Sequence, residues 1–302
     1  MRTSGQTEIN THDWRIKIDA ARGGQIVECT WKEQEILASG RPGLWPVDQH
    51  AGCFALVPFS NRIRDAEFTF EGRKVRLLKP EFAMPHALHG MGWRQAWTIE
   101  QRLPGSVEMV LDHGKGQWPW PFRATQVVRV DATGLSLSLS ILNTGKERMP
   151  AGLGFHPYFP RTIDVRLRME AEGYWRTDPA SPGLPVVWCA MSPHTDFGEF
   201  RSLKGIDLDN CFTGWSGHLT LDYPTRMLHI SMHASHQQGN LIVYCPGDGG
   251  VLCCEPVSHA NNAINAQNLP ARQAMDVLAP GEAMSVEMTL SPRVISANQR
   301  DT

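Results

Sequence analysis

The chain has 302 residues, with 29 Lys and Arg against 31 Asp and Glu and a formal net charge of −2. These charges are evenly mixed along the chain, so we do not expect nucleic acid or an anionic membrane as a partner. No stretch approaches the roughly 18 apolar residues of a membrane span, and residues 1–20 lack the apolar segment of a secretory signal. We therefore expect a cytoplasmic protein.

The seven cysteines form no C-x-x-C pair and no spacing typical of a zinc site. We interpret them as reduced thiols with mostly structural roles. Cys253 and Cys254 are adjacent in the sequence, so on a strand their side chains would point to opposite faces.

Alternation of apolar and polar residues, which is typical of half-buried strands, dominates the chain. In chain order it predicts strands at residues 14–18, 135–141, 163–169, 218–223, 228–232 and 284–290. The strand at 163–169 is expected to place Ile163 on its apolar face. Two hairpins are predicted, one turning near Gly72 and the other through Pro224 and Thr225.

Helical periodicity is scarce, and the best candidate for a helix is residues 271–278. Many short strands separated by Gly- and Pro-rich turns are typical of a sandwich or a barrel. The alternation favours antiparallel strands, since buried parallel strands tend to be apolar throughout. We predict an all-β protein, a large antiparallel sheet structure forming a single domain over residues 1–302, with its core at about 14–292.

Four segments interrupt the alternation and concentrate polar groups. They are "LVPFSNRIRDAEF" with Asn61 and Arg62, "MPHALHGMGWRQAW" with His86, His89 and Trp93, "GLGFHPYFP" with His156, and "CCEPVSHANNAIN" with Glu255. Five tryptophans lie in or near such segments: Trp45, Trp93, Trp97, Trp118 and Trp120. Aromatic rings stack well on the apolar faces of sugar rings, although most buried tryptophans only pack in cores or rims.

Glu255 is the most informative of these residues. It follows the apolar run "GGVLCC" and precedes a proline, so we expect it at the end of a buried strand. A carboxylate there is costly unless it is paired or used in chemistry, but it could equally have reached solvent. Two interpretations apply likewise to the other residues. Arg62 is either a surface arginine or a functional one, and His156 is either a packed core histidine or a functional one. If they meet, His156 and Glu255 form a plausible acid–base pair, because their ordinary pKa values are roughly 6.5 and 4.3.

The ordered set of motifs resembles a known family. "NRIRDAEFTFEGRKVRL", "HALHGMGWRQAW", "GFHPYFP", "DLDNCF" and "CCEPVSHANNAIN" occur in the order found in aldose 1-epimerases, the galactose mutarotase family. The resemblance extends from about Gly23 to Leu290 and is strongest to the bacterial aldose 1-epimerase-like branch. It implies a large antiparallel β-sandwich, the galactose mutarotase-like supersandwich.

The resemblance also implies site residues. By their positions in the family motifs, His156 corresponds to the general acid, Glu255 to the general base and His89 to a second active-site histidine. The implied substrate-binding residues are Asn61, Arg62, His86, Asp209 and Trp93. The nearby Asp207 competes with Asp209 for its role.

One motif departs from the family pattern. The common "N-x-LHGG" is "HALHGM" here, so His86 stands where asparagine is frequent and Met91 replaces a glycine. We expect this difference to affect which sugar is preferred more than the chemistry.

The implied reaction interconverts the α and β anomers of a free aldose through ring opening and closure. It transfers no electrons and no group, so no cofactor and no metal is predicted. We expect nearby carboxylates to raise the pKa of His156 and the pH dependence to be bell-shaped. A small-molecule sugar is the expected partner, with the chain acting as a monomer or homodimer. The sequence does not name the sugar.

Three alternatives remain open from the residues. A hexose-6-phosphate 1-epimerase would use Arg62, Arg64 and Arg94 as a phosphate clamp. A non-catalytic carbohydrate-binding protein of the same fold would keep the aromatic residues but lose the acid or the base. A metal-dependent cupin-like enzyme would use the ligands His86, His89, His156 and Glu255.

A further histidine cluster lies in "LHISMHASH". His229 and His233 would share one face of a continued strand. We interpret them, with His236, as surface or loop residues.

Overall fold

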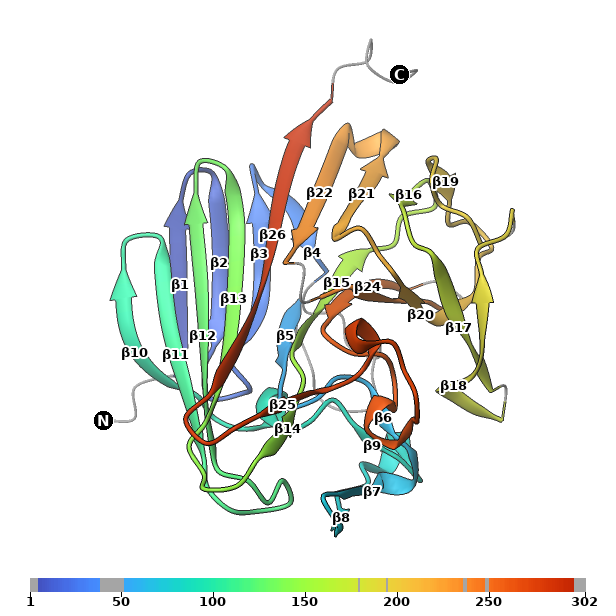
Figure 1. Ribbon diagram of the computed structural model, residues 1–302. Helices are drawn as coiled ribbons and strands as arrows, with labels where there is room; N and C mark the ends of the chain where they lie inside the picture. The colour runs from blue at the N-terminus through green and yellow to red at the C-terminus, as the bar shows by residue number, and fades with distance from the viewer. Residues whose placement is uncertain are drawn as a thin grey trace.

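The computed structural model describes residues 5–38, 52–178, 180–193, 195–235, 238–247 and 250–295. Two large antiparallel sheets lie face to face, with three small strand pairs at one end (Figure 1). Trp45 and His236 lie outside the described residues. None of the described helices has the length and apolar character that crossing a membrane requires.

The larger sheet has 11 strands. They are β1 (Gln6–Thr11), β2 (Trp14–Asp19), β3 (Gln25–Trp31), β4 (Gln34–Leu37), β5 (Cys53–Leu56), β15 (Gly154–Pro160), β17 (Gly173–Asp178), β18 (Ser181–Ala190), β20 (Leu208–Thr213), β23 (Asn240–Cys245) and β24 (Val251–Val257). Their spatial order is β1-β2-β3-β5-β15-β24-β23-β20-β17-β18, with β4 paired to β3. β15 and β24 therefore lie at the middle of this sheet, as Figure 1 shows.

The second sheet has nine strands. They are β10 (Thr98–Leu103), β11 (Ser106–His113), β12 (Phe122–Asp131), β13 (Gly134–Asn143), β16 (Arg166–Met169), β19 (Arg201–Ser202), β21 (His218–Tyr223), β22 (Leu228–Ala234) and β26 (Ala283–Val294). Their spatial order is β10-β11-β12-β13-β26-β22-β21-β16-β19.

Three strand pairs and six short 3-10 turns complete the structure. The pairs are β6 (Arg62–Ile63) with β9 (Ala87–Leu88), β7 (Glu67–Phe70) with β8 (Arg73–Arg76), and β14 (Met149–Ala151) with β25 (Asp276–Leu278). The turns are η1 (Arg64–Ala66), η2 (Glu81–Ala83), η3 (Gly92–Arg94), η4 (Pro224–Arg226), η5 (Ala263–Asn265) and η6 (Ala271–Gln273).

Period-two alternation builds the core between the two sheets, as predicted. In β13 the four alternating apolar residues Leu135, Leu137, Leu139 and Ile141 are fully buried, and they pack in one cluster with Ile16 and Ile18 of β2. The intervening serines face outward, because successive side chains on a strand point to opposite faces. Both predicted hairpins are confirmed: β7–β8 turns at Gly72, and β21–β22 turns through Pro224 and Thr225.

Two predictions of local structure are wrong. Ile163 is 71% exposed, because β16 begins only at Arg166 and the preceding residues form a turn. Residues 271–278 form no α-helix; they consist of the turn η6 and the short strand β25. The pairing of β25 with β14 overrides the weak helical periodicity of this segment.

The larger sheet buries side chains on both faces. Cys254 packs in the core between the sheets, whereas Cys253 belongs to a second apolar cluster that includes Phe54, Tyr158 and Trp93. The two cysteines therefore point to opposite faces, as predicted. The second cluster lies under the β6–β9 pair and η3, because His89 and Trp93 from that region contact the ring of Phe54.

Replacing Leu137 by alanine tests the core between the sheets. The side chain is fully buried in the central strand β13, so Leu137→Ala should lower the free energy of unfolding by about 2–5 kcal/mol. Urea denaturation followed by tryptophan fluorescence measures this loss. Leu103→Ala is the matched control, since Leu103 is 53% exposed and should change stability by no more than about 0.5 kcal/mol. Equal losses in the two variants would contradict the assignment of this core.

Candidate active site

The registers of three adjacent strands bring distant polar residues together. β15 pairs with β24 so that Gly154 lies opposite Val257 and Tyr158 opposite Cys253. This register sets His156 of β15 opposite Glu255 of β24, on the same face of the sheet. Directly opposite side chains on neighbouring strands lie within contact distance.

His156 and Glu255 form a close buried pair. The Nε2 atom of His156 lies 3.2 Å from Oε1 of Glu255, and the two side chains are 2% and 3% exposed. Glu255 does not stand at the end of its strand, as the sequence suggested, because β24 continues through Pro256 to Val257. Its other oxygen, Oε2, is buried and has no hydrogen-bond partner among the described residues. A buried unsatisfied carboxylate oxygen is uncommon, which makes Glu255 a candidate functional residue.

Burial sets the protonation state of this pair. Burial lowers the pKa of His156 to about 3. Burial raises the pKa of Glu255 well above its ordinary value, and Asp209 adds to that increase while Arg62 opposes it. The expectation that neighbouring carboxylates raise the pKa of His156 is therefore wrong, because desolvation outweighs the partner. Burial thus favours the uncharged pair, with the proton on Glu255, over the ion pair.

His89 stands beside this pair in a fixed tautomer. Its ring centroid lies 5.0 Å from that of His156, and the rings meet edge to face. The backbone N–H of Asn61 donates to Nδ1 of His89 at 3.2 Å, so the ring proton is on Nε2. Burial, with positive charge nearby, lowers the pKa of His89 well below its ordinary value. His89 is thus a neutral hydrogen-bond donor.

Asn61 and His89 both adopt left-handed backbone conformations, with φ values of 52° and 60°. The backbone N–H of His89 also donates to the carbonyl of Asn61 at 3.0 Å. Such conformations are uncommon for residues other than glycine and concentrate at functional sites. The two bonds hold the loop after β9 against the loop before β6 and fix the direction of the His89 ring.

Arg62 and Asp209 form the more exposed part of the site. Nη1 of Arg62 lies 3.9 Å from Oδ2 of Asp209, and the side chains are 21% and 23% exposed. Burial raises the pKa of Asp209 despite the opposing effect of Arg62. Asp207 is exposed and accepts a hydrogen bond from the backbone N–H of Gly247, away from Arg62. Asp209 is therefore the aspartate that lies in the site.

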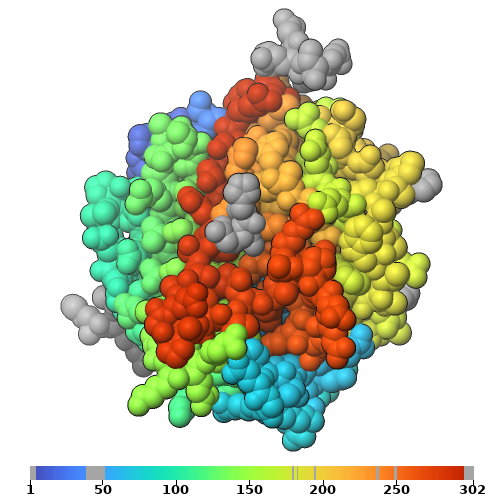
Figure 2. All heavy atoms as spheres, viewed as in Figure 1, coloured from blue at the N-terminus to red at the C-terminus, as the bar shows by residue number. Residues whose placement is uncertain are grey.

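Gly183 of β18 packs directly against Arg62. Its φ is +78°, and a Cβ atom placed on it would lie 1.9 Å from Nη1 of Arg62. The carbonyl of Gly183 accepts a hydrogen bond of 2.8 Å from Nδ2 of the buried Asn261. The backbone N–H of Asn262 in turn donates to the carbonyl of Arg62. Figure 2 shows the segment after β24 lying against the segment of β6–β9, as these bonds require.

His86 and Trp93 lie near this centre but not in the row of acid and base. Nδ1 of His86 accepts the backbone N–H of Asp65 at 3.0 Å, and burial lowers its pKa. Trp93 stacks on Phe54, and its buried Nε1 has no hydrogen-bond partner among the described residues. The other described tryptophans of the polar segments, Trp97, Trp118 and Trp120, are buried in the core between the sheets.

Sequence reasoning missed three residues that surround His156. Phe54 lies opposite it on β5, with ring centroids 4.6 Å apart, and Tyr158 stacks on it at 4.5 Å. Tyr158 and Cys253 lie two residues from His156 and Glu255, so period-two alternation places them on the same face. Phe54 carried no such signal, because it stands in an unbroken apolar run.

The metal-binding alternative required His86, His89, His156 and Glu255 as ligands. The described residues instead group His156 and Glu255 with Cys253, with one ligand atom of each lying within 4.8 Å of the others. His86 and His89 are not part of this group, and their Nδ1 atoms accept backbone N–H groups. The proposed four-ligand set is therefore not assembled.

The family follows from comparison with known proteins. A family model described as aldose 1-epimerase matches residues 10–291. The chain belongs to the aldose 1-epimerase family. It is 31% identical over 284 residues to the uncharacterized protein YphB of Escherichia coli K12, with 91% of this chain and 95% of that protein covered.

Solved structures agree with this family and its fold. The crystal structure of a candidate aldose 1-epimerase from Escherichia coli K12 matches with a TM-score of 0.85 and 28% identity, covering 96% of this chain and 99% of that one. A galactose mutarotase-like protein from Clostridium acetobutylicum matches with a TM-score of 0.85 and 19% identity over 95% of each chain, which supports the fold alone. The predicted mutarotase-like antiparallel fold is confirmed.

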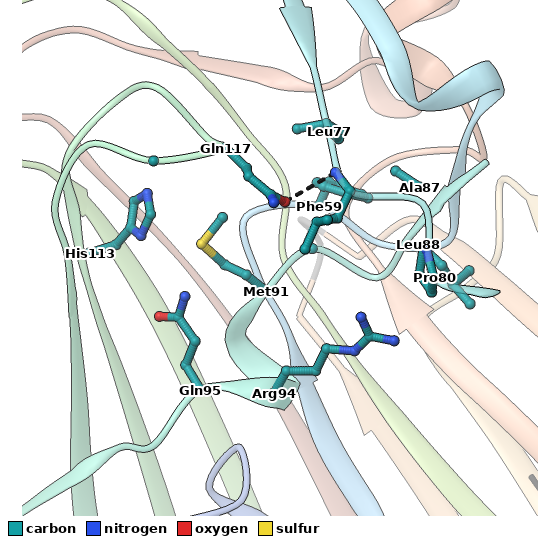
Figure 3. A pocket seen from close by; sticks show the side chains of 13 residues that line it. Phe59, Leu77, Pro80, Ala87, Leu88, Met91, Arg94, Gln95, His113 and Gln117 are labelled. Carbon is teal, nitrogen blue, oxygen red and sulfur yellow. Dashed lines mark hydrogen bonds between the residues drawn. The ribbon is translucent and has the colours of Figure 1, made fainter. Parts of the chain in front are cut away.

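An apolar hollow of about 300 Å³ lies beside the site rather than in it (Figure 3). Leu88 and Gly90 line it, whereas His89 between them does not. At its far side the backbone N–H of Leu78 donates to Oε1 of Gln117, the bond drawn in Figure 3. Since neither His156 nor Glu255 lines this hollow, it is not where the acid–base pair acts.

Proposed function

We propose that this member of the aldose 1-epimerase family is a mutarotase that interconverts the α and β anomers of a free aldose. The observation that supports this most directly is the 3.2 Å contact between His156 and Glu255 in a buried polar row. Ring opening of a sugar needs one group that accepts a proton and one that donates it. These two side chains supply both within the width of a sugar ring.

The proton balance of the proposed reaction closes within the pair. With the cyclic sugar bound, Glu255 is ionised and takes the proton of the C1 hydroxyl, while protonated His156 donates to the ring oxygen. The C1–O5 bond breaks and C1 becomes an aldehyde carbon. After rotation about the C1–C2 bond, His156 takes back the proton of the O5 hydroxyl and Glu255 returns one to the carbonyl oxygen. The pair carries one proton before and after each step.

The surrounding residues orient the sugar and stabilise charge on oxygen. The Nε2–H of His89 donates to an oxygen of the substrate, because Nδ1 is already occupied by Asn61. Arg62 and Asp209 bind ring hydroxyls as donor and acceptor, and Trp93 and His86 border the sugar. Arg62 also favours the ionised form of Glu255, since it lowers the pKa of that carboxyl group. No cofactor takes part in this proposal.

The hexose-6-phosphate alternative receives less support. Of the three arginines that it needs, Arg62 pairs with Asp209, Arg94 lies over the ring of Trp93 at 4.2 Å, and Arg64 is exposed. Arg62 and Arg94 both lie close enough to His89 to lower its pKa, but the carboxyl group of Asp209 beside Arg62 would repel a phosphate there. A non-catalytic sugar-binding protein would have no reason to bury a histidine–glutamate pair at a desolvation cost.

Removing either member of the pair tests the proposal. Glu255→Gln and His156→Gln should each lower the kcat of mutarotation by about 10²–10⁴. Polarimetry of freshly dissolved α-glucose and α-galactose, with the spontaneous rate subtracted, measures this loss. Glu287→Gln changes an exposed glutamate of β26 and should keep the wild-type rate. Near-normal activity in a folded Glu255→Gln or His156→Gln variant would refute the mechanism.

A pair of glycine variants tests the position of Arg62. Gly183→Ala should raise KM severalfold, because the new Cβ displaces the guanidinium that binds the sugar. Gly281→Ala is the matched control, since Gly281 has the same φ of +78° but nothing within 4 Å of its Cβ position. Gly183→Ala and Gly281→Ala should lower the melting temperature by similar amounts, because the flexible end of Arg62 can move away from the new Cβ atom. Equal KM values in the two variants would show that Arg62 does not contact the substrate.

The pH dependence tests the uncharged resting pair. A second proton binds only when pH falls to the pKa of His156, which burial lowers to about 3, and the last proton leaves only above the ordinary range of a glutamate. The value of kcat/KM should therefore not fall as the pH is lowered from about 7 to about 5, through the ordinary histidine pKa. Blank-subtracted polarimetry at each pH checks this. A fall in kcat/KM centred near pH 6.5 as the pH is lowered would contradict the uncharged resting pair.

A further inference from the structure

A second polar hollow lies on the outer face of the nine-stranded sheet. Its volume is about 470 Å³, within the range of ligand sites. It lies over β16, β21, β22 and the end of β26, which lie side by side in the upper part of Figure 1. We call it the outer-face pocket and define it by Arg168, Phe200, His218, His229, Ser231 and Arg293.

A buried charge network forms the floor of the outer-face pocket. Asp222 is fully buried although it points away from the core, and its carboxylate accepts a hydrogen bond of 2.6 Å from Nε of Arg166. Nε2 of His229 lies 2.7 Å from the other oxygen of Asp222. A buried carboxylate without such partners would be strongly destabilising. The network thus holds a rigid set of side chains under the pocket.

This network also orients Arg293. Its Nη2 donates to Nδ1 of His229 at 2.9 Å, which leaves the ring proton on Nε2 toward Asp222. Burial lowers the pKa of His229, in agreement with a neutral ring that accepts a hydrogen bond. The interpretation of His229 as a surface or loop residue is therefore wrong, whereas its strand neighbour His233 is exposed.

The pocket carries an excess of positive charge. Arg166 is compensated by Asp222, but neither Arg168 nor Arg293 has a carboxylate within ion-pair distance among the described residues. The guanidinium of Arg168 lies 4.8 Å from the ring centre of Phe200. Ser231 of β22, which lies between the two arginines' strands, adds a hydroxyl group, whereas Ser291 of β26 donates its own to the carbonyl of Thr133. Arginines without acidic partners, beside hydroxyl donors, are the groups that recognise phosphate.

We infer that the outer-face pocket binds a small organic phosphate, with Arg168 and Arg293 as the guanidinium groups that line it. The volume exceeds what a bare oxyanion needs, and Pro292 and Ile295 add apolar lining for the body of the ligand beside Phe200, whose ring contacts Arg168 and His229. The site lies on the outer side of the sheet that does not contain His156 and Glu255. The inference therefore does not depend on the proposed mutarotase activity.

Isothermal titration calorimetry of the full chain with glucose 6-phosphate, inorganic phosphate and glucose tests the inference. Glucose 6-phosphate should bind, and Arg168→Gln and Arg293→Gln should each weaken its binding at least about tenfold, as expected for a lost charge-assisted hydrogen bond. Both arginines are exposed, so these variants should fold. Arg129→Gln is the matched control, because it removes an exposed arginine from the same sheet without lining the pocket.

The titration results distinguish which phosphate binds and at which site. Inorganic phosphate binding as tightly as glucose 6-phosphate would overturn the organic-phosphate assignment in favour of a bare oxyanion. Binding that survives both substitutions unchanged would place the phosphate elsewhere, including at Arg62, and would overturn the inference. No heat from glucose 6-phosphate at low ionic strength would also overturn it, since salt weakens such sites most.

Discussion

The site depends on one constraint, the desolvation of a histidine and a glutamate that share a single proton. Burial disfavours the charged form of both groups, so it lowers the pKa of His156 and raises that of Glu255. In the proposed mechanism the pair is uncharged, with the proton on Glu255, while the bound sugar is the open-chain aldehyde. Closing the ring moves the proton to His156, and Arg62 supports the ionised carboxylate that results. The proposed reaction thus alternates between an uncharged state that burial favours and an ionised state that Arg62 helps to stabilise.

The fold supplies the rigidity that this balance requires. His156 and Glu255 lie on the two central strands of an 11-stranded sheet, with the core between the sheets packed against the opposite face. Phe54 and Tyr158 cover the imidazole from neighbouring positions and exclude water around it. The groups proposed to contact sugar hydroxyls come instead from loops and from β6 and β20, where more exposure is tolerated.

Period-two alternation depends on neighbours in the sequence, and it predicted the strands and an antiparallel sandwich or barrel. The resemblance to the family implied the sandwich and the roles of the candidate site residues. The facing of His156 and Glu255 depends on the register of β15 against β24, which no local pattern contains. For the same reason the contact of Gly183 with Arg62 had no signal in the sequence. Where local pattern misled, as at Ile163 and at residues 271–278, a turn or a distant strand pairing decided the structure.

Charge balance separates the two polar sites. In the candidate active site one guanidinium, that of Arg62, lies near two carboxyl groups, those of Asp209 and Glu255. A dianionic phosphate placed there would meet the carboxyl groups of Asp209 and Glu255 beside that one guanidinium, so a neutral sugar fits the site better. The outer-face pocket has the opposite balance, because Arg168 and Arg293 face it without acidic partners among the described residues. A neutral ligand and an anionic ligand are thus proposed to bind different faces of different sheets.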